Sequence, residues 1–271
     1  MSRVEQLTDN IYVLSDLEPA DPARSWLPSD TSGFEPFNKY VLLEDDCALL
    51  IETGAAAHDE SIQESLREIV KDRLLVILPT RSELESIGNM GSIIDNFPRV
   101  ELITTTRALP PLGLAHMRPD RRESVKARRI VRGEKLAGAG FPTLDTVTPI
   151  IRILNTIWIH DRRSGILFTS DTFSNELLPD RETTTIRRDS FGLPDVAAVR
   201  RSIIARFDWV ERARTQALQR QWADLFALIK PTGIAPSLGR VTMGADAAAD
   251  AIDLYRRALF ENSARFGFSE G

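Results

Sequence analysis

The chain has 271 residues, 42% of them hydrophobic and 27% charged, which is the composition of an ordinary globular protein and not of a disordered one. Its formal net charge of −5 argues against a dominant attraction to nucleic acid or to anionic lipid, and we expect neither as a partner. The single cysteine, Cys47, excludes a disulfide framework and a cysteine-rich metal site, and no stretch approaches the roughly 18 apolar residues of a membrane span, so we expect a cytoplasmic protein.

The first hundred residues alternate strands with helices. Residues 11–14 and 39–43 are predicted as short strands, with an irregular connection at 18–30, and residues 47–52 form an almost continuous apolar strand. In the helix that follows, Ile62, Leu66, Ile69 and Val70 repeat at the spacing of one buried stripe. A strand at 74–78, a short helix at 90–96 and a strand at 100–104 complete a β-α-β-α-β order, which predicts crossover connections onto one sheet.

The second part of the chain changes character at Pro110 and Pro111. The basic stretch 121–132 is predicted as a solvated loop and helix, in preference to a nucleic-acid site. Strands are predicted at 150–154, 156–159 and 166–169, and Asp171 lies where the last of them ends. Helical periodicity returns after Asp195, interrupted by a strand-like segment at 233–236, and residues 246–260 form a closing amphipathic helix.

An unusual loop follows the strand at 74–78. It reads Arg-Ser-Glu-Leu-Glu-Ser-Ile-Gly-Asn from residue 81 to residue 89, the frame of a metal-binding loop written H-x-E-x-D-H-x-G-N. Arg81 and Ser86 stand where that frame has its two histidines. The function of the chain therefore depends on whether a metal site survives these changes.

Five segments taken together resemble the metallo-β-lactamase fold and, within it, the diiron branch found in flavodiiron proteins and oxygen-binding diiron proteins. They are residues 38–43 with 49–54, 81–89, 131–138, 167–173 and 235–239. The resemblance implies an α/β (α+β) fold, the four-layer αββα sandwich, as a single domain over residues 1–271. Because the chain ends at Gly271 directly after the closing helix, we expect no flavodoxin-like domain.

The same resemblance implies that the metal ligands are degenerate. Glu83 keeps the glutamate of the family loop, Glu85 replaces the aspartate, and Asp171 keeps the bridging aspartate. A further histidine is expected near Ile151 or Arg152, and neither residue can replace it.

The last ligand position also lacks its histidine. The family segment P-S-H-G reads here with Leu238 in its third place. The three histidines of the chain, His58, His116 and His160, fall at no ligand position and are interpreted as ordinary surface or loop side chains. We therefore expect no histidine-based metal site and no cofactor.

Two outcomes are open for the remaining carboxylates, Glu83, Glu85 and Asp171. In the first, Arg81, with Arg152 as a second candidate, places a guanidinium where the metal charge was, because clustered carboxylates need a compensating cation. In the second, the carboxylates hold a single hard divalent ion, with Ser86 and water completing the coordination shell.

The first outcome predicts a non-catalytic binding, regulatory or assembly protein, and we favour it. The alternative is a divergent metal-dependent hydrolase or oxidoreductase. Serine hydrolysis is not favoured, because no histidine is placed to activate Ser86 or another serine near the site. Relatives of this branch often pair head to tail, so a homodimer is expected, with a protein or small-molecule partner. Trp26, Phe34, Phe37 and Trp209 could line a pocket or interface, and for Trp209 we favour core packing.

Overall fold

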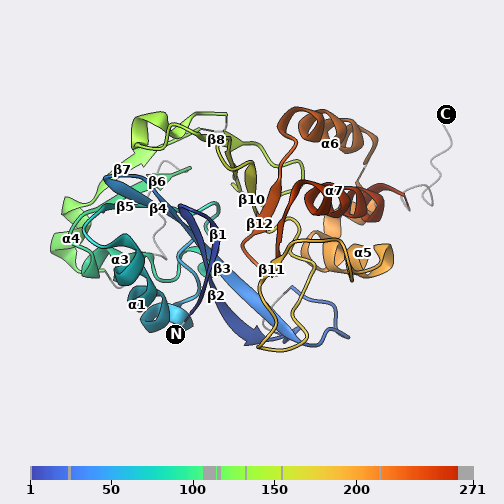
Figure 1. The fold of residues 1–271 in the computed structure, drawn as a ribbon, viewed down its shortest axis with the longest axis horizontal. Coiled ribbons are helices and arrows are strands. Elements are labelled where there is room, and N and C mark those ends of the chain that lie inside the picture. Colours follow the sequence, from blue (N-terminus) through green and yellow to red (C-terminus); the bar gives the residue numbers. More distant parts are fainter. Residues whose placement is uncertain are drawn as a thin grey trace.

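Two β-sheets face each other between two layers of helices in the computed structural model, which describes residues 2–23, 26–105, 114, 117–131, 133–153, 155–213 and 215–261 (Figure 1). The first sheet has seven strands in the order β1-β2-β3-β4-β5-β6-β7. These are β1 (Arg3–Thr8), β2 (Ile11–Pro19), β3 (Phe34–Leu43), β4 (Cys47–Ile51), β5 (Leu74–Leu78), β6 (Val100–Thr104) and β7 (Lys126–Arg129). Strands β1 to β4 pair antiparallel and β4 to β7 pair parallel, as the alternating strands and helices predicted.

The second sheet has six strands in the order β11-β13-β12-β10-β9-β8. These are β8 (Leu144–Val147), β9 (Trp158–Asp161), β10 (Ile166–Ser170), β11 (Ile186–Arg187), β12 (Gly233–Pro236) and β13 (Val241–Met243). The central pair, β10 and β12, is parallel, whereas β9 pairs antiparallel with both β8 and β10. The two sheets therefore bring the carboxyl ends of β4, β5, β10 and β12 into one region.

Helices cover the outer face of each sheet (Figure 1). The first sheet carries α1 (Asp59–Val70), α2 (Leu84–Ile87), α3 (Met90–Asn96) and α4 (Pro119–Ser124), and the second carries α5 (Val196–Arg206), α6 (Thr215–Ile229) and α7 (Ala245–Phe260). Short 3-10 turns lie at η1 (Ala56–His58), η3 (Leu136–Ala139) and η4 (Asp208–Arg212). No helix in the described part of the chain has the length and apolar character needed to cross a membrane.

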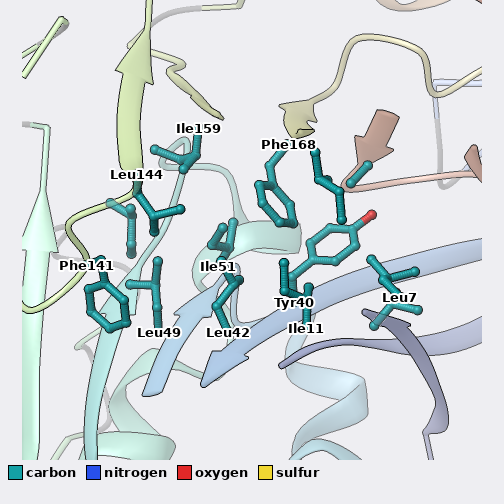
Figure 2. Close-up of a cluster of buried hydrophobic side chains, with 14 of the residues drawn as sticks. Leu7, Ile11, Tyr40, Leu42, Leu49, Ile51, Phe141, Leu144, Ile159 and Phe168 are labelled. Atoms are coloured by element: carbon teal, nitrogen blue, oxygen red, sulfur yellow. The ribbon is translucent and has the colours of Figure 1, made fainter. Parts of the chain in front are cut away.

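Three apolar clusters fill the spaces between the four layers. The cluster between the sheets includes Tyr40, Leu49, Ile51 and Phe168, whose side chains point toward one another in Figure 2. The Tyr40 and Phe168 rings meet edge to face with centroids 5.0 Å apart. A second cluster joins the first sheet to α1 and α3, and a third joins the second sheet to α5, α6 and α7. The four-layer αββα architecture expected from the sequence is thus confirmed.

Two local predictions are wrong. The segment predicted as a strand at 150–154 forms bends over its described residues, 150–153, and Ile151 is buried in the third apolar cluster. Its apolar residues reflect burial against helices and not strand pairing. In the basic stretch, Lys126–Arg129 forms β7, an edge strand, where a solvated loop and helix were expected. Exposed arginine and lysine on an edge strand discourage pairing with another chain.

Two single-residue predictions are also wrong, and others lie outside the described residues. Trp209, assigned to the core, is 40% exposed. His58, interpreted as a surface or loop histidine, is 6% exposed because the start of α1 packs it against β2 and β3. Pro110, Pro111 and His116 lie outside the part of the chain that the structure describes.

Candidate functional site

Four strands of the two sheets end at one buried polar region. Each of these strands is short and apolar, and the first polar residues after it begin the site. The residues that follow are Glu52 after β4, Thr80 and Arg81 after β5, Asp171 after β10, and Ser237 after β12. All of them are buried.

Glu52 is the deepest carboxylate of this region. It accepts hydrogen bonds from the hydroxyls of Thr80 and Ser237, the latter at 2.9 Å, and from the backbone N–H of Thr80 at 3.3 Å. The Thr80 hydroxyl lies 2.8 Å from that of Ser170, which joins the two sheets. Burial raises the pKa of Glu52, and the positive charge of Arg81 with these hydrogen bonds opposes the rise.

Arg81 projects among the carboxylates. Its side chain is 1% exposed, and its Nη1 contacts Oδ1 of Asp171 in an ion pair. Its Nε lies 3.5 Å from Oε2 of Glu83, whose side chain is 26% exposed. The positive charge of Arg81 also acts to lower the pKa of the buried Glu52 carboxyl. One guanidinium therefore serves carboxylates that follow three different strands.

A second buried arginine extends the network to helix α5. This helix begins where the side chain of Asp195 accepts a hydrogen bond from the N–H of Ala198, and it ends at Arg206. Arg206 Nη1 donates to Oδ1 of Asp171 at 3.2 Å, and its Nη2 lies 3.5 Å from Oε1 of Glu35. Burial lowers the pKa of the Arg206 guanidinium, and the charges of Glu35 and Glu85 oppose this.

The result is a series of alternating charges that we call the buried ion chain. It runs through Glu52, Arg81, Asp171, Arg206 and Glu35, each no more than 5% exposed. The series ties β3, β4, β5, β10 and α5 together at one end of the sandwich. Buried charges of this kind are tolerated only when each has its partner, so the five positions depend on one another.

The backbone is strained where two of these strands end. Glu52, Ser170 and Phe173 have φ angles of 65°, 53° and 68°, a region that residues other than glycine rarely adopt. Such strain persists only where the surrounding structure enforces it, and it concentrates at functional sites. Here it turns the chain sharply, so that the Glu52 and Asp171 side chains face the interior.

Gly54 belongs to the same turn and permits a close approach. Its φ is +77°, and a Cβ there would lie 2.9 Å from Cδ of Lys39 and 3.6 Å from Nδ2 of Asn89. We expect Gly54→Ala to lower the free energy of unfolding by about 2–4 kcal/mol, because backbone strain adds to overpacking.

Urea denaturation measures this effect, and Gly133→Ala is the matched control. Gly133 has a φ of +84°, and a Cβ there would meet no atom within 4 Å, so its substitution reports the backbone contribution alone. Equal losses in the two variants would contradict the predicted clash with Lys39.

The other residues expected at the site occupy different places. Leu238 is 2% exposed and pairs with Phe37 through an isolated β-bridge, so it brings apolar surface to the site. Ser86 is buried, and its carbonyl accepts hydrogen bonds from Thr53. Glu85 is half-buried and acts on Arg206.

Arg152 is not drawn into the network. It is half-buried, and no hydrogen bond or ion pair among the described residues joins it to the buried ion chain. The two described histidines are elsewhere as well. His58 is bound to Glu18 at 2.8 Å, and His160 lies on β9. Among the described residues no imidazole neighbours the buried serines of the site, and Ser237 donates instead to the Glu52 carboxylate.

Known proteins resemble the chain in structure but not in sequence. No family model and no curated protein matches it. Rubredoxin oxygen:oxidoreductase from Desulfovibrio gigas matches 94% of this chain and 61% of its own, with a TM-score of 0.69 and 16% identity. The flavodiiron protein from Giardia intestinalis matches 95% of this chain and 59% of its own, with a TM-score of 0.68 and 13% identity. A DIM-1 metallo-β-lactamase matches 95% of this chain and 97% of its own, with a TM-score of 0.57 and 12% identity.

The chain has the metallo-β-lactamase fold. Its likeness to flavodiiron proteins confirms the resemblance expected from the five sequence segments. The chain spans about three-fifths of the length of the two oxygen-reducing or flavodiiron chains, and at these identities the likeness concerns the fold alone.

The expectation of no cofactor is contradicted by these similarities. The solved structures include proteins named for a flavin and two irons, and no feature of the chain positively supports the absence of a cofactor. Whether two iron ions fit at the buried ion chain depends on the side chains present there. Within the described residues no group of three or more His, Cys, Asp or Glu is placed to hold a metal ion, and Arg81 already pairs with Asp171. These residues do not fit two iron ions.

Sequence reasoning missed three members of the buried ion chain as site residues. Glu52 was noted only as part of an apolar strand motif, although an ionisable residue at the end of a buried strand is itself a signal. Arg206 stood in a helical pattern, and Glu35 lay between the predicted irregular connection and the predicted strand at 39–43. No local sequence pattern at either position indicates which residue it pairs with.

Proposed function

We propose that this chain is a non-catalytic binding or regulatory protein built on the metallo-β-lactamase fold, related to the flavodiiron branch. The observation that carries the proposal is the position of Arg81, which contacts Asp171 and lies 3.5 Å from Glu83. A guanidinium remains protonated at physiological pH, donates hydrogen bonds only and cannot ligate a metal or act as a base. Its presence among these carboxylates favours binding or scaffolding over turnover.

The expected homodimer and the cytoplasmic location belong to the same proposal. The composition supports the location, because a chain with the single cysteine Cys47 can form no disulfide within itself and needs no oxidising compartment to fold. Exposed aromatic surface at Trp26 and Trp209, 52% and 40% exposed, supports a role in contacts with a partner.

Comparison of the wild type with Glu83→Gln and Asp171→Asn tests the absence of catalysis at this site. After incubation with Fe2+, Mn2+ or Zn2+, each protein is assayed for β-lactam hydrolysis and for reductant-driven oxygen consumption. We expect the wild-type rates to equal those of both variants, because Arg81 holds the carboxylates that the chemistry would need. Glu83→Gln keeps the shape of a partly exposed side chain, so this comparison holds even if Asp171→Asn unfolds.

Turnover in the wild type that Glu83→Gln removes would contradict the proposal. It would support instead the metal-dependent hydrolase or oxidoreductase that uses Glu83, Glu85 and Asp171.

A further inference from the structure

A cavity lies outside the buried ion chain, where the edge strands of the two sheets come together. It is an open cavity of about 730 Å3 that is bordered by β1 and by the segment around β11. These are the edge strands of the first and second sheets. The carboxylate of Glu5 on β1 accepts hydrogen bonds from Thr184 and Thr185, which fixes the two borders relative to each other. The volume lies within the range of about 300–1,000 Å3 that small-molecule sites occupy.

The lining of this cavity is rich in arginine although the whole chain is acidic. Three arginines, Arg187, Arg188 and Arg240, line it together with the carboxylates of Glu5 and Asp189. Glu5 accepts from the threonines named above, and Asp189 accepts from the backbone N–H of Phe191 at 3.0 Å. Arg187 and Arg240 are both paired with Glu176, so the attraction of the cavity for an anion depends on Arg188.

Two of the three arginines are held by neighbouring residues, and the third has no such contact in the described chain. Arg187 is 5% exposed and donates to Glu176 and to the carbonyls of Asp189 and Phe191. Arg240 donates to Glu176 at 3.1 Å and to the Thr184 carbonyl at 3.2 Å. Arg188 is exposed, and within the described chain its side chain has no ion pair or hydrogen bond. It is the guanidinium that can pair with an incoming oxyanion.

An aromatic ring stands beside these guanidiniums. Phe191 is 89% exposed, more than any other large hydrophobic residue in the described part. The backbone of Phe191 is held in place, because its N–H donates to Asp189 and its carbonyl accepts from Arg187. A large apolar ring held in water at the edge of a cavity is suited to stacking on a planar ligand.

We propose that this cavity binds a ligand that joins an anionic group to a planar ring, the chemistry of a nucleoside phosphate. Arg188 pairs with the phosphate, and Phe191 stacks on the ring. Arg187 and Arg240, both held by Glu176, form the wall of the cavity beside them. The site is independent of the function proposed for the buried ion chain.

Isothermal titration calorimetry of the full chain with AMP, adenosine and inorganic phosphate tests this proposal. We expect AMP to bind more tightly than either adenosine or phosphate. Arg188→Ala and Phe191→Ala should each weaken AMP binding by about tenfold, the loss of one charged or stacking contact. Arg118→Ala, at a 58% exposed side chain, and Leu228→Ala, at an 82% exposed residue, are matched surface controls and should leave binding unchanged.

Three results would overturn the proposal: no AMP binding at millimolar concentration, AMP binding that neither Arg188→Ala nor Phe191→Ala weakens, or phosphate or adenosine binding as tightly as AMP. Because the variants alter exposed side chains, loss of the fold does not confuse these outcomes. Glu83→Gln should leave AMP binding intact, so failure of this proposal is distinguishable from failure of the function proposed for the buried ion chain.

Discussion

Replacing Arg81 with methionine is expected to lower the free energy of unfolding by about 3–5 kcal/mol, because it removes one partner of a buried ion pair, leaves Asp171 with Arg206 alone and removes the positive charge that acts on Glu52. Methionine keeps the length of the side chain, so the loss reports charge more than volume. Urea denaturation at neutral pH measures it. The deficit should shrink as the pH falls, since burial already raises the pKa of Glu52 and protonation of this carboxyl relieves its unpaired charge.

Arg162→Met is the matched control for this experiment. Arg162 pairs with Asp145 at 2.9 Å, but its side chain is 47% exposed, so its loss should cost less than about 1 kcal/mol.

If Arg81 supplies the charge of a cation, millimolar Mg2+ or Mn2+ should raise the melting temperature of Arg81→Met by more than that of the wild type. An Arg81→Met protein as stable as Arg162→Met would refute the role given to Arg81.

Lys39 and Asp16 form a second buried ion pair, and either single substitution should cost about 3–5 kcal/mol. Lys39 is fully buried in β3, its ammonium group contacts Asp16 on β2, and it donates to the Phe37 carbonyl at 2.9 Å. Lys39→Met leaves the Asp16 carboxylate buried without its cation, and Asp16→Asn leaves the ammonium group unpaired. The double variant should lose less than the sum of the single losses by at least about 2 kcal/mol.

Chemical denaturation of the four proteins completes this double-mutant cycle. Additive losses would mean that the two charges do not stabilise each other. Ser61, which donates to Asp16 at 2.9 Å, provides a control, because Ser61→Ala removes one hydrogen bond to the carboxylate but leaves its cation in place, and it should cost only about 1.5–3 kcal/mol.

The same pair predicts how stability changes with pH. Burial acts to raise the pKa of Asp16, but Lys39, His58 and Ser61 outweigh it and lower the pKa from its usual 3.8. A lowered folded-state pKa contributes stability that is fully present above the unfolded value and is lost as the pH falls through the folded value. As the pH falls below about 4, the wild type should therefore lose more stability than Asp16→Asn.

The strongly periodic segments of the fold could be predicted from the sequence. The strands at 74–78 and 100–104 and the helix at 90–96 coincide with β5, β6 and α3. Their apolar residues repeat at the spacing of one structure and are bounded by turn residues, so local information is sufficient. The predicted strand at 150–154 failed because Ile151 is apolar for contact with helices far away in the sequence. β7 was missed because an edge strand needs no apolar pattern.

The candidate site was predictable only where its residues are neighbours in the chain. The loop from Arg81 to Ser86 is contiguous, and the family resemblance pointed to Asp171. Arg206 is 35 residues from Asp171, its hydrogen-bond partner, and Glu35 reaches the site from β3. The prediction of no cofactor failed because it rested on the histidines missing from one set of expected ligand positions. Their loss gives no information about the rest of the chain.

The sequence by itself determined the β-α-β-α-β order up to residue 104, the identity of the altered loop and the loss of histidine at the positions that the resemblance implies. These depend on local periodicity and on which side chains are present. Only the tertiary structure decided that Arg81 meets Asp171, that Arg206 and Glu35 extend the buried ion chain, and that Arg188 and Phe191 border one cavity. Ion pairs act over a few ångströms, so the packing of two sheets and a helix determines which charges come within reach.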